Sequence, residues 1–225
     1  MNEYQSQQLE LKKSILIQAL NHVPFDGWSE KSLLAAASDL GVSPATALNL
    51  YPGRGLEMVS LHSQYADRLM IDDFRKLDNK PNNIAAQIEI FIQVRLQRWN
   101  AHREAIRSGT GLLLSPGNIP LGSKLLYQTI DCIWREIGDR STDFNFYTKR
   151  ATLSAIYAAT LFYWLDDKSE GHWNTWKFLE RSLARLGRIP KIKAKTKKWR
   201  RYLPDPFLFY NELRKRTFRP IKRVR

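Results

Sequence analysis

Apolar residues recur at intervals of three and four positions along most of this chain, which is the spacing of amphipathic helices. A first helix is predicted over residues 9–20. The stretch 22–29, HVPFDGWS, ends it, because Pro24 and Gly27 are helix breakers. Helical signals outnumber strand signals throughout, so the pattern predicts an all-α protein.

Two further short helices are predicted, each with its own start signal. Ser29 can cap a helix that stops at Gly41, and Ser43 followed by Pro44 reads as the N-cap and first residue of the next helix. Three short helices with a glycine turn between the second and the third form a helix-turn-helix. We assign this N-terminal unit to residues 1–54.

A helical body is predicted over residues 55–187. Its helices are expected at 55–77, about 83–107, 121–137, a long helix through Leu165, and 175–187, which makes eight or nine helices in all. The string SGTGLLLSPGNIP, residues 108–120, is predicted to be a loop around a short apolar plug. Asp166 and Asp167 are predicted to form a solvated helix end.

The net charge of +14 comes from the C-terminal end of the chain. Residues 1–184 hold 20 basic and 20 acidic side chains, whereas residues 185–225 hold 16 Lys and Arg against Asp205 and Glu212. Residues 188–225 therefore form a basic tail that should seek an anionic surface. Within it, the segment PDPFLFYNELRKR predicts a short amphipathic helix with aromatic residues.

The chemistry of the tail fits an anionic membrane, because basic residues gain energy near anionic lipid and aromatic residues seat at the interface. The predicted membrane residues are Lys197, Lys198, Trp199, Arg200, Phe207, Phe209 and Tyr210. Binding to nucleic acid is the alternative, since such runs attract any polyanion. No apolar window is long enough for a spanning helix, and the first residues show no signal or transit peptide.

The pattern offers little for catalysis or metal binding. The four histidines include no pair at i, i+3 or i, i+4, and no Gly-rich loop follows a strand. Asp166 and Asp167 are adjacent in a helix and so point about 100° apart. We therefore predict no catalytic residue, no metal site and a protein that is not an enzyme.

The helix-turn-helix raises an alternative, a transcription regulator that resembles the TetR family and has an apolar ligand pocket. Readout of DNA needs Arg, Lys, Asn or Gln on the recognition helix and basic groups for the phosphates. The stretch SPATALNL has one Asn and no cation, and residues 29–53 carry only Glu30, Lys31 and Asp39. We therefore expect no sequence-specific binding of nucleic acid.

The segment 138–150, GDRSTDFNFYTKR, interleaves charges and aromatic rings at the start of the long helix. At 100° per residue, Phe146 lies in line with the apolar face, whereas Asp143, Tyr147 and Arg150 lie on its flank. One interpretation is a core Phe146 with a capped, solvated first turn. The other is an aromatic and ionic anchor for a protein partner. Periodicity alone leaves both open.

Four irregular strings of this chain resemble the Coq nine family of ubiquinone biosynthesis accessory proteins. They are HVPFDGWS at 22–29, LLLSPGNIP at 112–120, the block at 138–171 and TWKFLERSL at 175–183. The resemblance implies a TetR-like, homodimeric all-α fold. It also implies a protein that binds isoprenoid quinone intermediates and presents them to the demethoxyubiquinone hydroxylase, a di-iron enzyme and the seventh Coq protein.

The resemblance also places the sites. The hydroxylase contact would fall on Asp143, Phe146, Tyr147 and the neighbouring Arg150. An isoprenoid quinone or other lipid, with no other cofactor, would lie among the apolar faces of the helices between residues 121 and 186. The residues nominated for that pocket are Trp134, Leu153, Ile156, Tyr157 and Trp164. The expected location is cytoplasmic and peripheral on the inner membrane, on the matrix side in a eukaryote.

Overall fold

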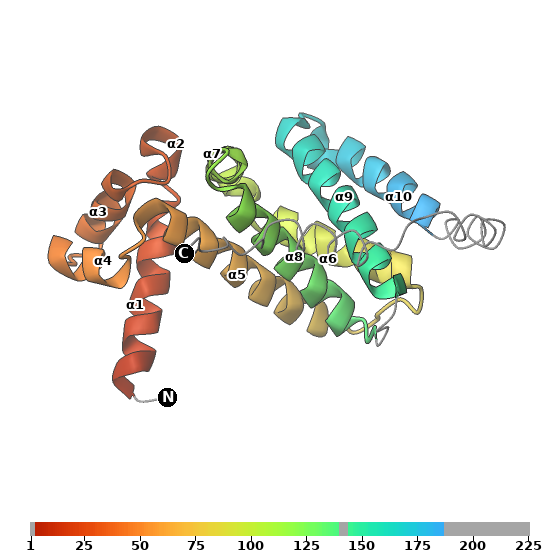
Figure 1. Ribbon diagram of the computed structural model, residues 1–225, viewed down its shortest axis with the longest axis horizontal. Coiled ribbons are helices and arrows are strands. Elements are labelled where there is room, and N and C mark those ends of the chain that lie inside the picture. Colours follow the sequence, from red (N-terminus) through yellow and green to blue (C-terminus); the bar gives the residue numbers. More distant parts are fainter. Residues whose placement is uncertain (1–2, 140–143, 187–225) are drawn as a thin grey trace, which may run out of the picture. The chain divides into compact units, whose positions relative to one another are not determined.

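The computed structural model describes residues 3–139 and 144–186, and in these residues every regular element is helical. The helices are α1 (Glu3–Ala19), α2 (Val23–Asp26), α3 (Glu30–Asp39), α4 (Pro44–Leu50), α5 (Arg54–Arg75), α6 (Ile84–Arg98), α7 (Arg103–Leu114), α8 (Ile119–Glu136), α9 (Phe144–Asp166) and α10 (Trp173–Leu186), with short 3-10 turns before α7 and α10 (Figure 1). The all-α prediction is confirmed. The predicted tail, residues 188–225, lies outside the described residues.

The N-terminal unit forms as its start signals predict. Ser29 and Ser32 make a capping box at the start of α3, and Ser43 accepts a hydrogen bond from the backbone N–H of Thr46 at the start of α4. Gly41 joins the two helices with φ of +67°, a conformation that favours glycine. Helix α1 packs against α3 and α4, with Ile15 and Leu16 fully buried.

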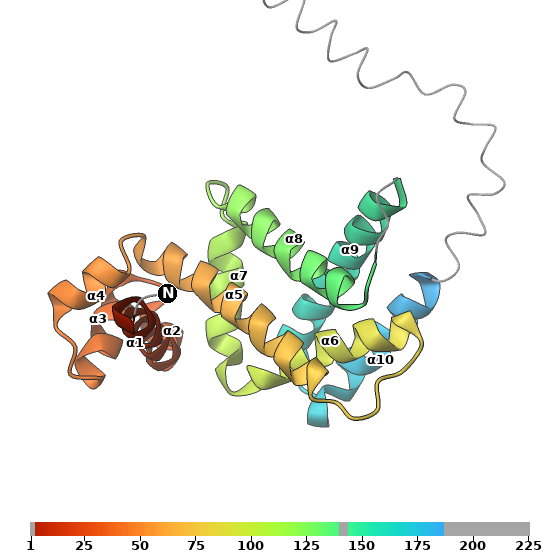
Figure 2. The same cartoon turned by 90° about the horizontal axis from the view of Figure 1, so that it is seen from below.

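Helix α5 links this N-terminal unit to the rest of the described chain. It starts beside the N-terminal helices, where it contacts α1 and α3, and α6 and α8 pack against it further along the chain (Figure 2). Helix α9 packs on α6, α7 and α8. The helices α5, α7, α8 and α9 therefore surround a common interior.

Two local predictions are wrong. Residues 103–114 form helix α7, so most of the predicted loop is helical, and the helix predicted over 83–107 is interrupted at the 3-10 turn Asn100–His102. The string 108–120 predicts a loop, but Gly109 is buried in α7, where it packs against Trp28.

Asp167 is buried and is not the solvated helix end that we expected. Its carboxylate accepts hydrogen bonds from the backbone N–H and hydroxyl of Ser169 and of Thr175, at 2.6–2.9 Å. Burial opposes ionisation, but these four hydrogen bonds outweigh it and hold the pKa of Asp167 well below its ordinary value. Asp167 thus caps the turn that leads into α10, whereas the neighbouring Asp166 is exposed.

Candidate functional site

Trp28 from the HVPFDGWS stretch packs against both α5 and α7. Gly27 turns the chain with φ of +66°, and the indole Nε1 of Trp28 donates a 2.8 Å hydrogen bond to the carbonyl oxygen of Ala105. A Cβ atom at Gly55 would overlap the backbone carbonyl of Trp28, and one at Gly109 would lie 2.9 Å from the indole nitrogen. Two helices therefore need glycine where they meet this one residue, α5 at its backbone and α7 at its side chain.

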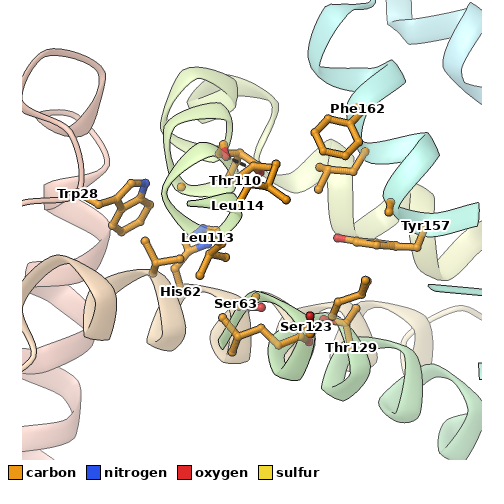
Figure 3. Close-up of a pocket in the computed structure, with 18 of the residues that line it drawn as sticks. Trp28, His62, Ser63, Thr110, Leu113, Leu114, Ser123, Thr129, Tyr157 and Phe162 are labelled. Atoms are coloured by element: carbon orange, nitrogen blue, oxygen red, sulfur yellow. Dashed lines mark hydrogen bonds between the residues drawn. The ribbon is translucent and has the colours of Figure 1, made fainter. Parts of the chain in front are cut away.

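A cavity of about 240 Å³ lies between Trp28 and the helices α5, α7, α8 and α9 (Figure 3). Its walls are mainly apolar, with Val59 on α5, Leu113 on α7, Leu126 on α8 and Leu161 on α9 among them. Ligand pockets in proteins are typically of this kind, largely apolar with a few placed polar groups.

The polar groups of the cavity form one connected network around Arg95. Its Nε donates to Asp67 at 2.9 Å, its Nη1 to the hydroxyl of Tyr157 at 2.7 Å, and its Nη2 to the hydroxyls of Ser63 and Thr129 at 3.3 and 3.4 Å. Thr129 in turn donates to Asp67 at 2.9 Å. The buried charge of Arg95 is therefore balanced by Asp67, and the cavity has a polar, overall neutral floor.

His62 contributes an uncharged wall beside this floor. Its ring lies 4.5 Å from that of Trp99 and 5.7 Å from that of Trp28, measured between ring centroids. Burial, with smaller contributions from the charges of Arg95 and His102, lowers the pKa of His62 to about 3. The imidazole is thus neutral near pH 7, and the cavity holds no net positive charge that would select an anion.

Of the five residues nominated for the lipid, the structure brings Tyr157 to this cavity. Trp134 lies under the start of α9, with the ammonium of Lys149 5.4 Å from its ring centroid. Leu153 and Trp164 are fully buried, and Ile156 is half-buried, but none of the three lines the cavity. Lipid contact at these four positions stays a prediction.

The start of α9 carries the aromatic pair of the predicted partner contact. Phe146 and Tyr147 meet edge to face at 5.1 Å, Phe146 is half-buried and Tyr147 is 69% exposed. Arg150 lies beneath them, 3% exposed, with its guanidinium carbon 3.4 Å from the centre of the Phe146 ring. Asp143 lies outside the described residues.

Buried carboxylates hold Arg150 in that position. Its guanidinium pairs with Asp131 of α8 at 2.8 Å and with Asp139 at 3.3 Å, and Asp139 also pairs with Lys149 at 2.7 Å. Arg150 therefore serves as a support for Phe146, while Tyr147 is the residue that presents its ring to solvent. Phe146 lies between the two alternatives of the sequence, partly in the core and partly at the surface.

Within the described residues, the helix-turn-helix has no charge on α4, and the basic side chains nearest to it are paired with acids. Helix α4 carries no charged residue, and the neighbouring cations are paired, Lys31 with Asp26 at 2.6 Å and Arg54 with Glu30 at 2.8 Å. Phosphate contacts require basic groups that can neutralise the DNA backbone. This unit instead supplies Trp28 to the cavity wall.

The described residues show neither a metal site nor a membrane-spanning helix. No group of three or more His, Cys, Asp or Glu side chains is placed to hold a metal ion. No helix among residues 3–139 and 144–186 combines the length and the apolar character required to cross a bilayer. The predicted membrane residues, Lys197 to Tyr210, lie outside the described part of the chain.

Sequence reasoning missed Arg95, Asp67 and Trp28 as residues of the site. Arg95 stands in an apolar run, FIQVRLQ, which is a signal of a buried cation that the helical pattern alone does not use. Asp67 follows Ala66 on the face of α5 that is buried. Neither feature of the sequence predicts that Arg95 pairs with Asp67, because α5 and α6 come together only in the folded chain.

Comparison with known proteins gives one family and one fold. The family model described as COQ9 matches residues 119–190. The ubiquinone biosynthesis protein COQ9-A, mitochondrial, of Xenopus laevis is 32% identical over 189 residues, which is 80% of this chain and 59% of that protein. The corresponding protein COQ9 of Homo sapiens is 33% identical over 186 residues, or 79% and 58% of the two chains. The chain thus spans about three fifths of the length of these curated relatives.

A solved structure shares the fold. A TetR transcriptional regulator from Nitrosomonas europaea superposes with a TM-score of 0.62 at 20% sequence identity, over 78% of this chain and 97% of that one. At this identity the likeness concerns the fold alone, and it confirms the predicted TetR-like architecture. The sequence matches, and not the fold, confirm the resemblance that the four strings indicated: this chain is similar to the COQ9 proteins of ubiquinone biosynthesis.

Proposed function

We propose that this protein takes part in ubiquinone biosynthesis as a lipid-binding protein that holds isoprenoid quinone intermediates in the cavity of α5, α7, α8 and α9. The observation that carries the proposal is the cavity itself, with apolar walls and a polar floor around Arg95 and Tyr157. An isoprenoid quinone has matching chemistry, a ring with oxygen acceptors and an apolar chain. The names of the relatives, all ubiquinone biosynthesis proteins, support the pathway.

The proposed role is accessory and not catalytic. The hydroxyl and guanidinium groups at the cavity floor are held in mutual hydrogen bonds, and the carboxylate of Asp67 accepts from Arg95 and Thr129. A general base needs a group free to take a proton from the substrate. The chemistry is therefore assigned to a partner, the demethoxyubiquinone hydroxylase, to which this protein would present its ligand.

The contact with the hydroxylase is proposed at the start of α9, with Tyr147 as its exposed anchor. An exposed aromatic ring held rigidly by neighbours is a typical interface hot spot, because little side-chain entropy is lost on binding. Here Phe146 and the buried Arg150 fix the base of the ring pair. A homodimer and a tail seated on an anionic membrane complete the proposal.

Identification of the bound lipid tests the proposed function. The full chain, purified from a host that makes ubiquinone, is expected to retain isoprenoid quinones or their precursors, seen by native mass spectrometry. A variant with Leu126→Trp, which fills the cavity from α8, should retain much less at equal folded content by circular dichroism. The proposal would be contradicted if Leu126→Trp retained as much lipid as the wild type. It would also be contradicted if every lipid retained by the wild type lacked an isoprenoid chain.

Substitution of Tyr147 by alanine is expected to weaken hydroxylase binding by at least tenfold, because hot-spot aromatics contribute about 2 kcal/mol or more. Its free energy of unfolding should change by less than about 0.5 kcal/mol, since the ring is mostly exposed. Tyr163→Ala, at an exposed tyrosine in the last turns of α9, is the matched control. Equal hydroxylase affinity for Tyr147→Ala and wild type would remove Tyr147 from the interface.

A regulator of transcription remains the second candidate, because the fold is TetR-like and has a ligand cavity. Helix α4 offers no cation for readout or phosphate contact. Selection of bound sequences from a random DNA pool separates the two candidates. Enrichment of one operator-like sequence by residues 1–187 would favour the regulator, and it would contradict the charge argument made above.

A further inference from the structure

The orientation of the ligand follows from where the cavity is polar and where it opens, and this inference rests on the proposed function. We propose that the ligand enters ring first, so that a ring oxygen accepts a hydrogen bond from the hydroxyl of Tyr157. The isoprenoid chain then leaves the cavity past Leu114, Ile119 and Phe162. Tyr157 would thus select for an oxygen-bearing ring.

The hydrogen-bond directions leave Tyr157 with a proton to donate. Arg95 carries only donors, so the 2.7 Å contact makes the hydroxyl oxygen of Tyr157 the acceptor. Burial raises the pKa of Tyr157, so the hydroxyl keeps its own proton. Within the described chain no acceptor takes that proton, and Figure 3 shows the hydroxyl directed into the cavity.

A second hydroxyl stands on the same floor. The hydroxyl oxygen of Ser63, on α5, also accepts from Arg95, at 3.3 Å, and it too lines the cavity. Thr129 differs, because its proton is already given to Asp67. Ser63 is half-buried, but the donor of Tyr157 is buried, and a buried donor without a partner costs free energy that a ligand oxygen would recover. The floor is therefore built to meet an acceptor, such as a quinone carbonyl, and not a hydrocarbon chain.

The volume of the cavity limits how much of the ligand it holds. An apolar cavity of about 150 Å³ accommodates one benzene ring, and drug-sized ligands occupy roughly 300–1,000 Å³. The 240 Å³ found here suits a substituted ring with a short piece of chain. The cavity has no room for a long isoprenoid chain in addition to the ring, so one end of the ligand stays outside.

The open end of the cavity is apolar. Leu114 at the end of α7, Ile119 at the start of α8 and Phe162 on α9 all line the cavity, and they are 57%, 50% and 46% exposed. The floor residues Tyr157 and Arg95 are buried by contrast. Exposed apolar side chains at the opening would cover the first isoprene units, whereas the polar ring gains its hydrogen bond at the buried end.

Titration with two probes tests the hydrogen bond. The first is a ubiquinone with a single isoprene unit, and the second is the same prenyl chain on a benzene ring without oxygens. Tyr157→Phe is expected to weaken binding of the quinone about tenfold, while binding of the hydrocarbon changes less than about twofold. Tyr163→Phe, which removes a hydroxyl from an exposed ring stacked on Phe178, should change neither.

The outcomes separate the orientation from the function. Equal loss for both probes, or loss for neither, would overturn the assignment of Tyr157, whereas failure of wild type to bind either probe would overturn the proposed function. If Tyr157→Phe does not fold, a labelling experiment on the wild-type protein tests the orientation instead. A ubiquinone with a photoreactive diazirine at the end of a short chain should label peptides containing Leu114, Ile119 or Phe162. Labelling of Trp28 and His62 instead would reverse the orientation.

Discussion

Asp67→Ala is expected to lower the free energy of unfolding by about 3–5 kcal/mol, which is the usual cost of leaving one partner of a buried ion pair without the other. The side chains of Asp67 and Arg95 are 8% and 11% exposed. Removal of the carboxylate leaves the guanidinium charged in the interior and takes the acceptor from Thr129. Urea unfolding followed by circular dichroism measures the change.

The surface pair Asp73–Arg98 is the matched control, because it joins the same two helices, α5 and α6. Arg98 donates to both carboxylate oxygens of Asp73, but its side chain is 39% exposed. Solvent screens such a pair, so Asp73→Ala should cost less than about 1 kcal/mol. Similar losses for the two variants would mean that water reaches Arg95 and that the cavity floor is not the dry network described.

Gly55→Ala is expected to prevent stable folding, or to cost at least about 3 kcal/mol, although it adds a single methyl group to a helix. The new Cβ would overlap the carbonyl oxygen of Trp28. This neighbour is backbone and cannot rotate away, so the start of α5 has to move from the wall that Trp28 forms. Overpacking that forces a backbone shift falls at the severe end of single substitutions.

Gly111→Ala supplies the control, because Gly111 lies in α7 and has open space where the methyl group would go. This change should stabilise the helix by up to about 1 kcal/mol, since alanine is the better helix former. Thermal unfolding of the two variants, with quinone binding by each, checks the prediction. A Gly55→Ala protein with wild-type stability would mean that Trp28 and α5 are not in the contact described.

The helical unit near the N-terminus could be predicted from the sequence because its signals are local. Ser29, Gly41 and Ser43 act on residues within one turn, so their types suffice to place the boundaries of α3 and α4. Helix α7 could not be predicted in the same way. Gly109 resembles a loop residue until Trp28, distant in sequence, is found against it.

The site was predictable only in part, for a related reason. Tyr157, Leu153 and Trp164 share the apolar side of α9, and periodicity treats them alike. Packing of the neighbouring helices decides that Tyr157 reaches the cavity while the other two are covered. Arg95 is a further case, because its burial depends on Asp67 of another helix. The exposure of Tyr147 follows from helical angles, whereas Arg150 of the same flank is buried because it pairs with Asp131 and Asp139.

The contact between Trp28 and α7 also determines when the cavity can form during synthesis of the chain. Its hydrogen bond to Ala105 joins residues 77 positions apart. At ~5–20 residues per second, a ribosome adds that length in about 4–15 s. Until then the indole of Trp28 cannot pack against α7. Helices α1 to α4 are therefore complete long before their apolar surface is covered. A nascent chain stalled before residue 105 should therefore expose this surface to chaperones, and one stalled well beyond it should not.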